Sequence, residues 1–486
     1  MLVAIASQSD CEYPDAEDCF SPDVRYPEYP FDHVASRPNH VYGLVRKALR
    51  DAGLDAANFD SPRWNPLGAY INPGARVFVL CNFVHHQRFN EDHDAFDSKC
   101  THASVLRAII DYLVIAAGIN GQIAFGNAPL QSCNWDLVLK QTGAARLLEF
   151  YNGRALSIEA RDLRLLAVDR SFSGRDVPVM EKDHARHTAT IKLREASELS
   201  ALSSAANGNG ASFRVADYDA RVTESSHRDG EHRYVIARDI LSADVIVSVP
   251  KLKTHEKVGI TCGLKGFVGI VGSKDCLAHH RFGGSENGGD EYPGSSRTRV
   301  KLSRYHDWVQ QLPREGAGRS LHMIIDRNLR RAIRRFGKIQ AGAWYGNDTC
   351  WRMALDLTRI AHYADRTGAM QDKPTRRNLM LIDGVIGGEG NGPLAPQAVH
   401  VGSVIFADNI ALGDSAAARL MGFDPERIPL IREALKSHEF PLVCEDPATA
   451  RIVCDGSRIS LDSIQPALRR SFLAPDGWRG HLELQA

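Results

Sequence analysis

A run of basic side chains follows a short apolar segment near the middle of the chain. After residues 245–249 and Pro250, basic residues recur at every second position, at Lys251, Lys253, His255 and Lys257. Because side chains of an extended segment alternate between its two sides, this spacing would project all four from one side. Ammonium groups beside an imidazole favour the binding of an anion and the transfer of protons.

Glycines recur at spacings of three and four directly after these residues, from Gly259 to Gly272, and Lys265 lies among them. Glycine lets a ligand or another backbone approach closely, and it leaves peptide N–H groups free to face an anion. The stretch therefore predicts an anion pocket at the carboxyl end of a strand, where open α/β sheets bind ligands. The alternative is a solvated lysine loop followed by a tightly packed glycine helix.

Apolar runs elsewhere predict the strands that position this stretch, at residues 77–81, 123–125, 245–249, 379–382 and 401–406. Polar residues follow several of these runs, namely Asn82, Asn127 and Asp383, and Asp383 opens a glycine-rich loop that contains Glu389. Helical patterns cover residues 39–54 and 104–117, and His102 lies just before the second. We expect an α/β fold with two lobes, mostly parallel sheets, flanking helices and polar residues gathered at the carboxyl ends of strands.

The chain divides by composition into four parts. Residues 1–38 predict an irregular arm rich in Asp, Pro and Tyr, and residues 39–320 an α/β domain that carries the basic motif. Residues 321–436 predict a second α/β lobe, and residues 437–486 a C-terminal tail. We expect the ligand in a cleft between the lobes.

Overall composition narrows the function classes. Lys plus Arg and Asp plus Glu are both 59, so the formal net charge is zero and extensive nucleic-acid binding is not expected. The ten cysteines contain no Cys-x-x-Cys pair, which predicts reduced thiols, a cytoplasmic location and no iron–sulfur cluster. The start of the chain does not read as a secretory signal, and no apolar run is long enough for a transmembrane helix.

Two further polar clusters have more than one interpretation. Cys276, His279 and His280 precede Asp290 and Glu291, which fits substrate contacts, a structured loop, or a metal site whose ion the sequence does not identify. A basic amphipathic helix is predicted from Arg327, Arg330, Arg331, Arg334, Arg335 and Lys338. It would contact a phosphorylated substrate, make a weak contact with an anionic membrane surface, or simply face solvent.

The motif from Pro250 to His255, followed by Gly263-Leu-Lys265, resembles the signature of a bacterial and archaeal family known as domain-of-unknown-function family number 362. The resemblance resumes at Asn82-Phe-Val, Thr101-His102 and Asp383-Gly384 and spans about residues 26 to 434. The resemblance implies two lobes around a cleft. It also implies that the chain belongs to the branch of the family that is often found near surface-polysaccharide genes. Cys81, Asn127 and Gly266 stand where the family usually has Lys, Asp and Asn, which implies either a changed substrate or a lost reaction.

A second, partial resemblance concerns His255 and Lys265, which are similar to a segment of the nickel-pincer lactate racemases. It implies that Lys265 would hold a nucleotide-derived metal cofactor and that His255 would be an acid–base group, as in a racemase or epimerase.

These patterns lead to one expected function and one alternative from another class. We expect an enzyme for a small anionic, phosphorylated or sugar-derived substrate, with His255, Lys265 and Asp383 as catalytic groups. The predicted substrate-binding residues are Lys251, Lys253, Asn82, His102, Asn127, His279, His280 and Glu389. The alternative is a protein that binds such a ligand in the same pocket without chemistry.

Overall fold

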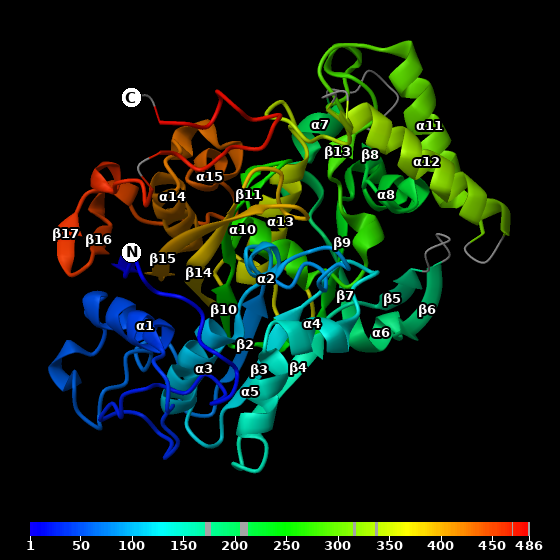
Figure 1. The fold of residues 1–486 in the computed structure, drawn as a ribbon. Helices are drawn as coiled ribbons and strands as arrows, with labels where there is room; N and C mark the ends of the chain where they lie inside the picture. The colour runs from blue at the N-terminus through cyan, green and yellow to red at the C-terminus, as the bar shows by residue number, and fades with distance from the viewer. Residues whose placement is uncertain (171–175, 205–211, 314–316, 336–338, 469, 485–486) are drawn as a thin grey trace.

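A computed structural model describes residues 1–170, 176–204, 212–313, 317–335, 339–468 and 470–484. One large sheet runs through the centre of the molecule, with strands in the order β17-β16-β1-β15-β14-β10-β2-β3-β4 (Figure 1). The strands of this path are β1 (Leu2–Ser7), β2 (Arg76–Cys81), β3 (Gln122–Asn127), β4 (Ser157–Asp162), β10 (Val245–Val249), β14 (Arg377–Glu389), β15 (Gln397–Ala407), β16 (Arg451–Cys454) and β17 (Ser457–Ile459). Two more strands, β11 (Lys251–His255) and β12 (Gly259–Ile260), join beside β14.

Most neighbouring strands of this sheet are parallel, which confirms the predicted α/β class. β14, β10, β2, β3 and β4 form a continuous parallel block, whereas β15 is antiparallel to both β14 and β1. The five predicted strands correspond to β2, β3, β10, β14 and β15. Their apolar runs are found in the interior of the sheet because apolar layers cover both of its faces.

Helices cover the two faces of the sheet, and alternate residues of each strand point to opposite layers. Val3, Phe78 and Ile246 pack in one buried cluster, whereas Leu2, Val77 and Val245 pack in the other. The first layer contains α10 (Cys262–Gly266), α13 (Cys350–Tyr363), α14 (Ile410–Leu420) and α15 (Pro429–Ala434). The second contains α1 (His40–Asp51), α3 (Ala103–Ala117), α4 (Trp135–Gln141) and α5 (Ala144–Tyr151) (Figure 1).

Each of the four parts into which the sequence was divided contributes strands to the large sheet. The predicted arm begins with β1, which pairs with β15 and β16, and residues 8–38 then contain no helix or strand. β14 and β15 extend the sheet across the predicted boundary near residue 320, and β16 and β17 from the predicted tail extend its other edge. The partners of β1 are more than 390 residues away along the chain, so local composition did not reveal this strand.

Smaller elements lie around the large sheet. They comprise α2 (His93–Asp97), α6 (His184–His187), α7 (Ser200–Ser204), α8 (Ala220–Ser226), α9 (Arg238–Ser242), β5 (Leu166–Arg170), β6 (Asp176–Glu181), β7 (Thr188–Lys192), β8 (Phe213–Arg214), β9 (Arg233–Ala237) and β13 (His280–Arg281). α11 (Arg297–Gln311) and α12 (Ala317–Arg335) pack side by side beyond β8 and β13 (Figure 1). Among the described residues, no helix is both long and apolar enough to cross a membrane.

Candidate functional site

A cavity of about 380 Å³ lies where the parallel strands β2, β3 and β10 end. Asn82 follows β2, Asn127 ends β3, and His255 ends the strand that continues from β10 through Pro250. Lys265 enters the lining from α10, and His279 enters it from the segment before β13. The cavity therefore brings together five of the predicted site residues, at the end of the sheet where α/β proteins bind ligands.

Three lysines give the cavity wall its charge. Lys257, Lys265 and Lys274 all line it, and each is less than a tenth exposed. Lys257 donates to the carbonyl of Ala341, and Lys274 makes a long bond of 3.4 Å to the carbonyl of Val268. Within the described residues, none of the three ammonium groups forms an ion pair with a carboxylate. A bound anion would offset the cost of holding these charges away from water.

Burial of two of these ammonium groups favours their neutral forms. Desolvation and, after it, the positive charge of Lys265 together lower the pKa of Lys274 to about 7. Desolvation likewise lowers the pKa of Lys265, and Lys257 acts in the same direction. Both side chains therefore lose their protons more readily than an exposed lysine does.

Two histidines face the same charged wall. The Nδ1 atom of His255 accepts the peptide N–H of Lys257 at 3.1 Å, and Nδ1 of His279 lies 3.1 Å from the carbonyl oxygen of Leu277. Desolvation lowers the pKa of both rings well below its usual value, and Lys265 is the largest electrostatic contributor to each shift. Both rings are therefore neutral at physiological pH.

Helix α12 adds arginines to the lining of the cavity. Arg327, Arg330 and Arg331 line it, and Arg330 forms ion pairs with Asp217 at 3.2 Å and Asp326 at 3.1 Å. The predicted basic amphipathic helix thus exists, and three of its arginines face the candidate site. Residues 336–338, which include Lys338, lie outside the described part of the chain.

The peptide N–H groups at the start of α10 do not face the cavity, which corrects one expectation. The Oδ1 and Oδ2 atoms of Asp414 accept the N–H groups of Gly263 and Leu264 at 2.7 and 2.8 Å. A Cβ atom on Gly263 would lie 2.3 Å from the sulfur of Met380, so this glycine allows close packing. The side chains around the cavity, rather than free peptide groups, supply its positive charge.

Lys251, His102 and Asp383 lie together in a different place and do not line the cavity. The ammonium group of Lys251 lies 3.0 Å from Oδ2 of Asp383, and the peptide N–H of His102 donates to the same oxygen at 3.0 Å. Tyr13 of the irregular arm donates its hydroxyl to Oδ1 of Asp383 at 2.6 Å. Asp383 lies inside β14, which runs on to Glu389, so the predicted strand end and loop at this position were wrong.

The remaining predicted residues, Lys253 and Glu389, do not line the cavity, although Lys253 contacts Asn82, which does. Lys253 donates to Oδ1 of Asn82 at 2.6 Å and to the carbonyl of Lys99 at 2.5 Å, and its side chain is fully buried. Glu389 accepts two bonds from the guanidinium of Arg470, at 2.7 and 2.8 Å. The pairing of β11 with β14 shifts register between Lys251 and Lys253, so these lysines and His255 contact three different environments.

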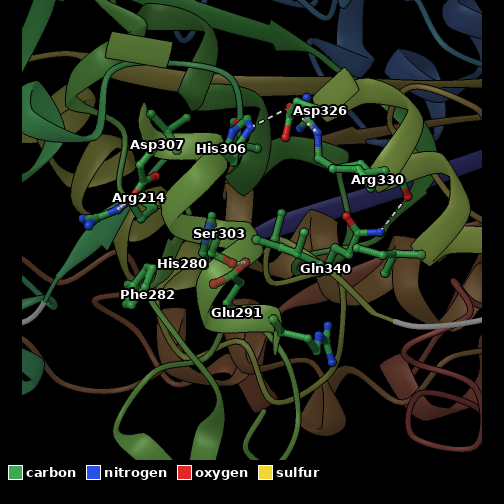
Figure 2. Close-up of a pocket in the computed structure, with 17 residues that line it drawn as sticks. Arg214, His280, Phe282, Glu291, Ser303, His306, Asp307, Asp326, Arg330 and Gln340 are labelled. Carbon is green, nitrogen blue, oxygen red and sulfur yellow. Dashed lines mark hydrogen bonds and ion pairs between the residues drawn. The ribbon is translucent and has the colours of Figure 1, made fainter. Parts of the chain in front are cut away.

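His280 lines a second, smaller cavity of about 60 Å³ beside α11 and α12. Figure 2 shows Glu291 facing Ser303 in this cavity, where the hydroxyl donates to the carboxylate at 2.5 Å. His306 lies nearby, with Nδ1 2.9 Å from Oδ2 of Asp326. This volume holds a few water molecules rather than a metabolite, so His280 and His279 face different cavities.

No group of three or more His, Cys, Asp or Glu side chains in the described ranges has an arrangement that could hold a metal ion. The thiol of Cys276 instead donates a hydrogen bond to the carbonyl oxygen of Ser273 at 3.1 Å. The nitrogen and oxygen donors that a zinc or nickel site would need are therefore not gathered around Lys265.

Sequence patterns did not single out Lys274, Thr261 and Tyr218, which also line the cavity. Lys274 is the first charged residue after Lys265 in the glycine-rich stretch. This position was the only local signal for it. Thr261 lies between Lys257 and Lys265 without a distinguishing pattern, and only the packing of a distant segment brings Tyr218 to the cavity.

The fold and the site define an α/β protein with a cavity lined by basic side chains at the carboxyl ends of its parallel strands. The chain belongs to the family described as Domain of unknown function (DUF362), whose model matches residues 170–419. The matched segment contains His255, Lys265 and His279, whereas Asn82 and Asn127 lie before it. The resemblance to lactate racemases is not supported by this comparison. No curated protein and no solved structure matched the chain.

Proposed function

We propose that the protein is an enzyme that acts on a small anionic metabolite, phosphorylated or sugar-derived, bound in the cavity at the strand ends. The observation that carries this proposal is Lys265, a buried ammonium group that lines the cavity without a carboxylate partner among the described residues. Lys257, Lys274, Arg327 and Arg331 line the same cavity. A phosphate group would satisfy several of these donors at once.

The lining also suits the uncharged part of such a metabolite. Apolar side chains alternate with the charged ones, among them Phe83, Leu130, Val268 and Leu277. Cavities of a few hundred Å³ with mostly apolar walls and a few polar groups are typical of small-molecule sites.

An enzyme is favoured over a binding protein without chemistry because two neutral imidazoles lie beside the ammonium groups. Anion binding alone needs only positive charge, whereas His255 and His279 add groups that exchange protons. A cytoplasmic location agrees with the ten cysteines, all of which have free thiols. A role in polysaccharide biosynthesis rests on the family resemblance alone.

Lys265→Met tests the anion site, and Lys373→Met is the matched control because Lys373 is exposed and away from the cavity. Pyrophosphate and a set of sugar phosphates are titrated into each protein by isothermal titration calorimetry. A hydrogen bond to a charged group contributes about 1.5–3 kcal/mol, so Lys265→Met is expected to weaken binding about 10-fold to 100-fold. Equal affinities of Lys265→Met and Lys373→Met would show that the cavity is not the anion site.

A further inference from the structure

The backbone fixes the two imidazoles of the cavity in opposite tautomers. A peptide N–H is always a donor, so Nδ1 of His255 must carry the lone pair that accepts the N–H of Lys257. A carbonyl oxygen is always an acceptor, so Nδ1 of His279 must carry the proton that is donated to Leu277. A neutral ring holds one proton, which leaves an N–H at Nε2 of His255 and a bare lone pair at Nε2 of His279.

The Nδ1 atoms of both rings already form hydrogen bonds, so the Nε2 atoms are the ring nitrogens that can contact a ligand. Both residues line the cavity, and neither Nε2 atom has a hydrogen-bond partner within the described chain. Lys265 also lines the cavity and lies near both rings. One site thus offers a base, a neutral donor and a charged donor.

We propose that the cavity abstracts a proton from its anionic ligand, with Nε2 of His279 as the base. The lone pair of Nε2 forms an N–H bond while a C–H or O–H bond of the ligand breaks, and the bonding electron pair stays on the ligand. The new negative charge is held by the Nε2–H of His255 and the ammonium group of Lys265. The Nδ1–H of the resulting imidazolium still donates to Leu277, and return of the proton from Nε2 restores the starting state.

This assignment rests on the proposed function, because the charge around His279 makes the base depend on a bound anion. Burial is the main cause of the low pKa of His279, and the positive charges of Lys265, Lys257 and Lys274 lower it further by disfavouring an imidazolium. His255 lies nearby and stays neutral for the same reason. A bound dianion would offset these positive charges and strengthen the base, so proton abstraction would begin only when the ligand is in place.

The tautomers are tested directly in the full-length protein with ¹⁵N-labelled histidine. Two-bond ¹H–¹⁵N spectra distinguish a protonated ring nitrogen from a bare one, and His255→Gln and His279→Gln identify the two sets of signals. We expect bare Nδ1 in His255 and bare Nε2 in His279. Adding pyrophosphate should raise the pKa of His279 by about one pH unit or more. A protonated Nε2 in His279, or no rise in its pKa on pyrophosphate binding, overturns the assignment.

Acylation by diethylpyrocarbonate, mapped by mass spectrometry, gives an independent measurement because this reagent attacks a bare ring nitrogen that is not already engaged in a hydrogen bond, as Nδ1 of His255 is. His279 should be acylated and His255 should not, and pyrophosphate at ten times its Kd should slow acylation of His279 about tenfold. Calorimetry on the same samples separates the two proposals. If pyrophosphate binds but His255 reacts ahead of His279, only the base assignment is wrong. If pyrophosphate does not bind, the proposed function fails, and the base assignment fails with it.

Discussion

The ammonium group of Lys251 lies 3.0 Å from Oδ2 of Asp383, and both side chains are completely buried. Tyr13 donates to the other oxygen of Asp383 and stacks on the ring of His102 at 3.9 Å between centroids. The pair therefore joins the irregular arm, the start of α3 and two strands of the sheet. Its position identifies Lys251 and Asp383 as structural partners in this protein.

Lys251→Ala is expected to destabilise the fold by about 3–5 kcal/mol, because it leaves the carboxylate of Asp383 buried without its positive partner. Urea unfolding followed by circular dichroism measures the loss. The control is Lys436→Ala, which removes an exposed ion pair with Glu433 and should cost less than about 1 kcal/mol. If the two variants unfold at the same urea concentration, the buried pair does not stabilise the fold.

Asp414→Ala is expected to be more harmful than Asp414→Asn. The carboxylate of Asp414 accepts the N–H groups of Gly263 and Leu264, and each group left without an acceptor costs about 1–3 kcal/mol. Asn keeps the size of the side chain and one oxygen acceptor. Thermal unfolding of both variants measures the difference, and an equal loss would mean that these bonds contribute little.

The same residue gives a stability change with pH whose sign follows from its pKa. Burial raises the pKa of Asp414 from 3.8 to about 7, so the folded protein holds this proton while the unfolded chain has released it. Wild-type stability should therefore fall relative to Asp414→Asn as the pH rises from about 4 to about 7. A constant difference between the two proteins across this range would contradict the shift.

Lys274 predicts the opposite trend at higher pH. Burial and Lys265 lower its pKa from 10.5 to about 7, so between these values the unfolded chain binds a proton that the folded protein lacks. Wild-type stability should rise relative to Lys274→Met as the pH increases from about 7 to about 10, by up to about 1.4 kcal/mol per pH unit. Unfolding curves at several pH values measure this slope, and parallel curves for the two proteins would show that Lys274 keeps its ordinary pKa.

Two glycines of α10 give a matched pair of substitutions. A Cβ atom at position 263 would lie 2.3 Å from the sulfur of Met380 and 2.8 Å from Cγ2 of Ile410, so Gly263→Ala should cost about 1–3 kcal/mol. At Gly266 the nearest atoms are 3.7 Å away and the backbone is helical, so Gly266→Ala should be neutral or stabilising by up to about 1 kcal/mol. Differential scanning calorimetry compares the two, and a larger loss for Gly266→Ala would contradict the packing shown here.

Local patterns were sufficient for the parallel strands and for part of the site. The apolar runs at β2, β3 and β10 predict buried strands, and Asn82, Asn127 and His255 follow from where these runs end. Lys265 followed from its isolation among glycines. These features depend on neighbours in the chain, so periodicity and composition reveal them.

The partners of the charged side chains depended on segments far apart in the chain. Lys251, Lys253 and His255 share one spacing in the sequence, but Asp383, Asn82 and the cavity separate their roles. The contacts that set the tautomers of His255 and His279 are local, since Lys257 and Leu277 each lie two residues away, but only the fold brings the two rings to one cavity. The sequence by itself determined which residue types could bind an anion and which strands would carry them. Tertiary structure decided which lysines are paired with carboxylates and which face the cavity, because the free energy of a buried charge depends on the groups packed around it.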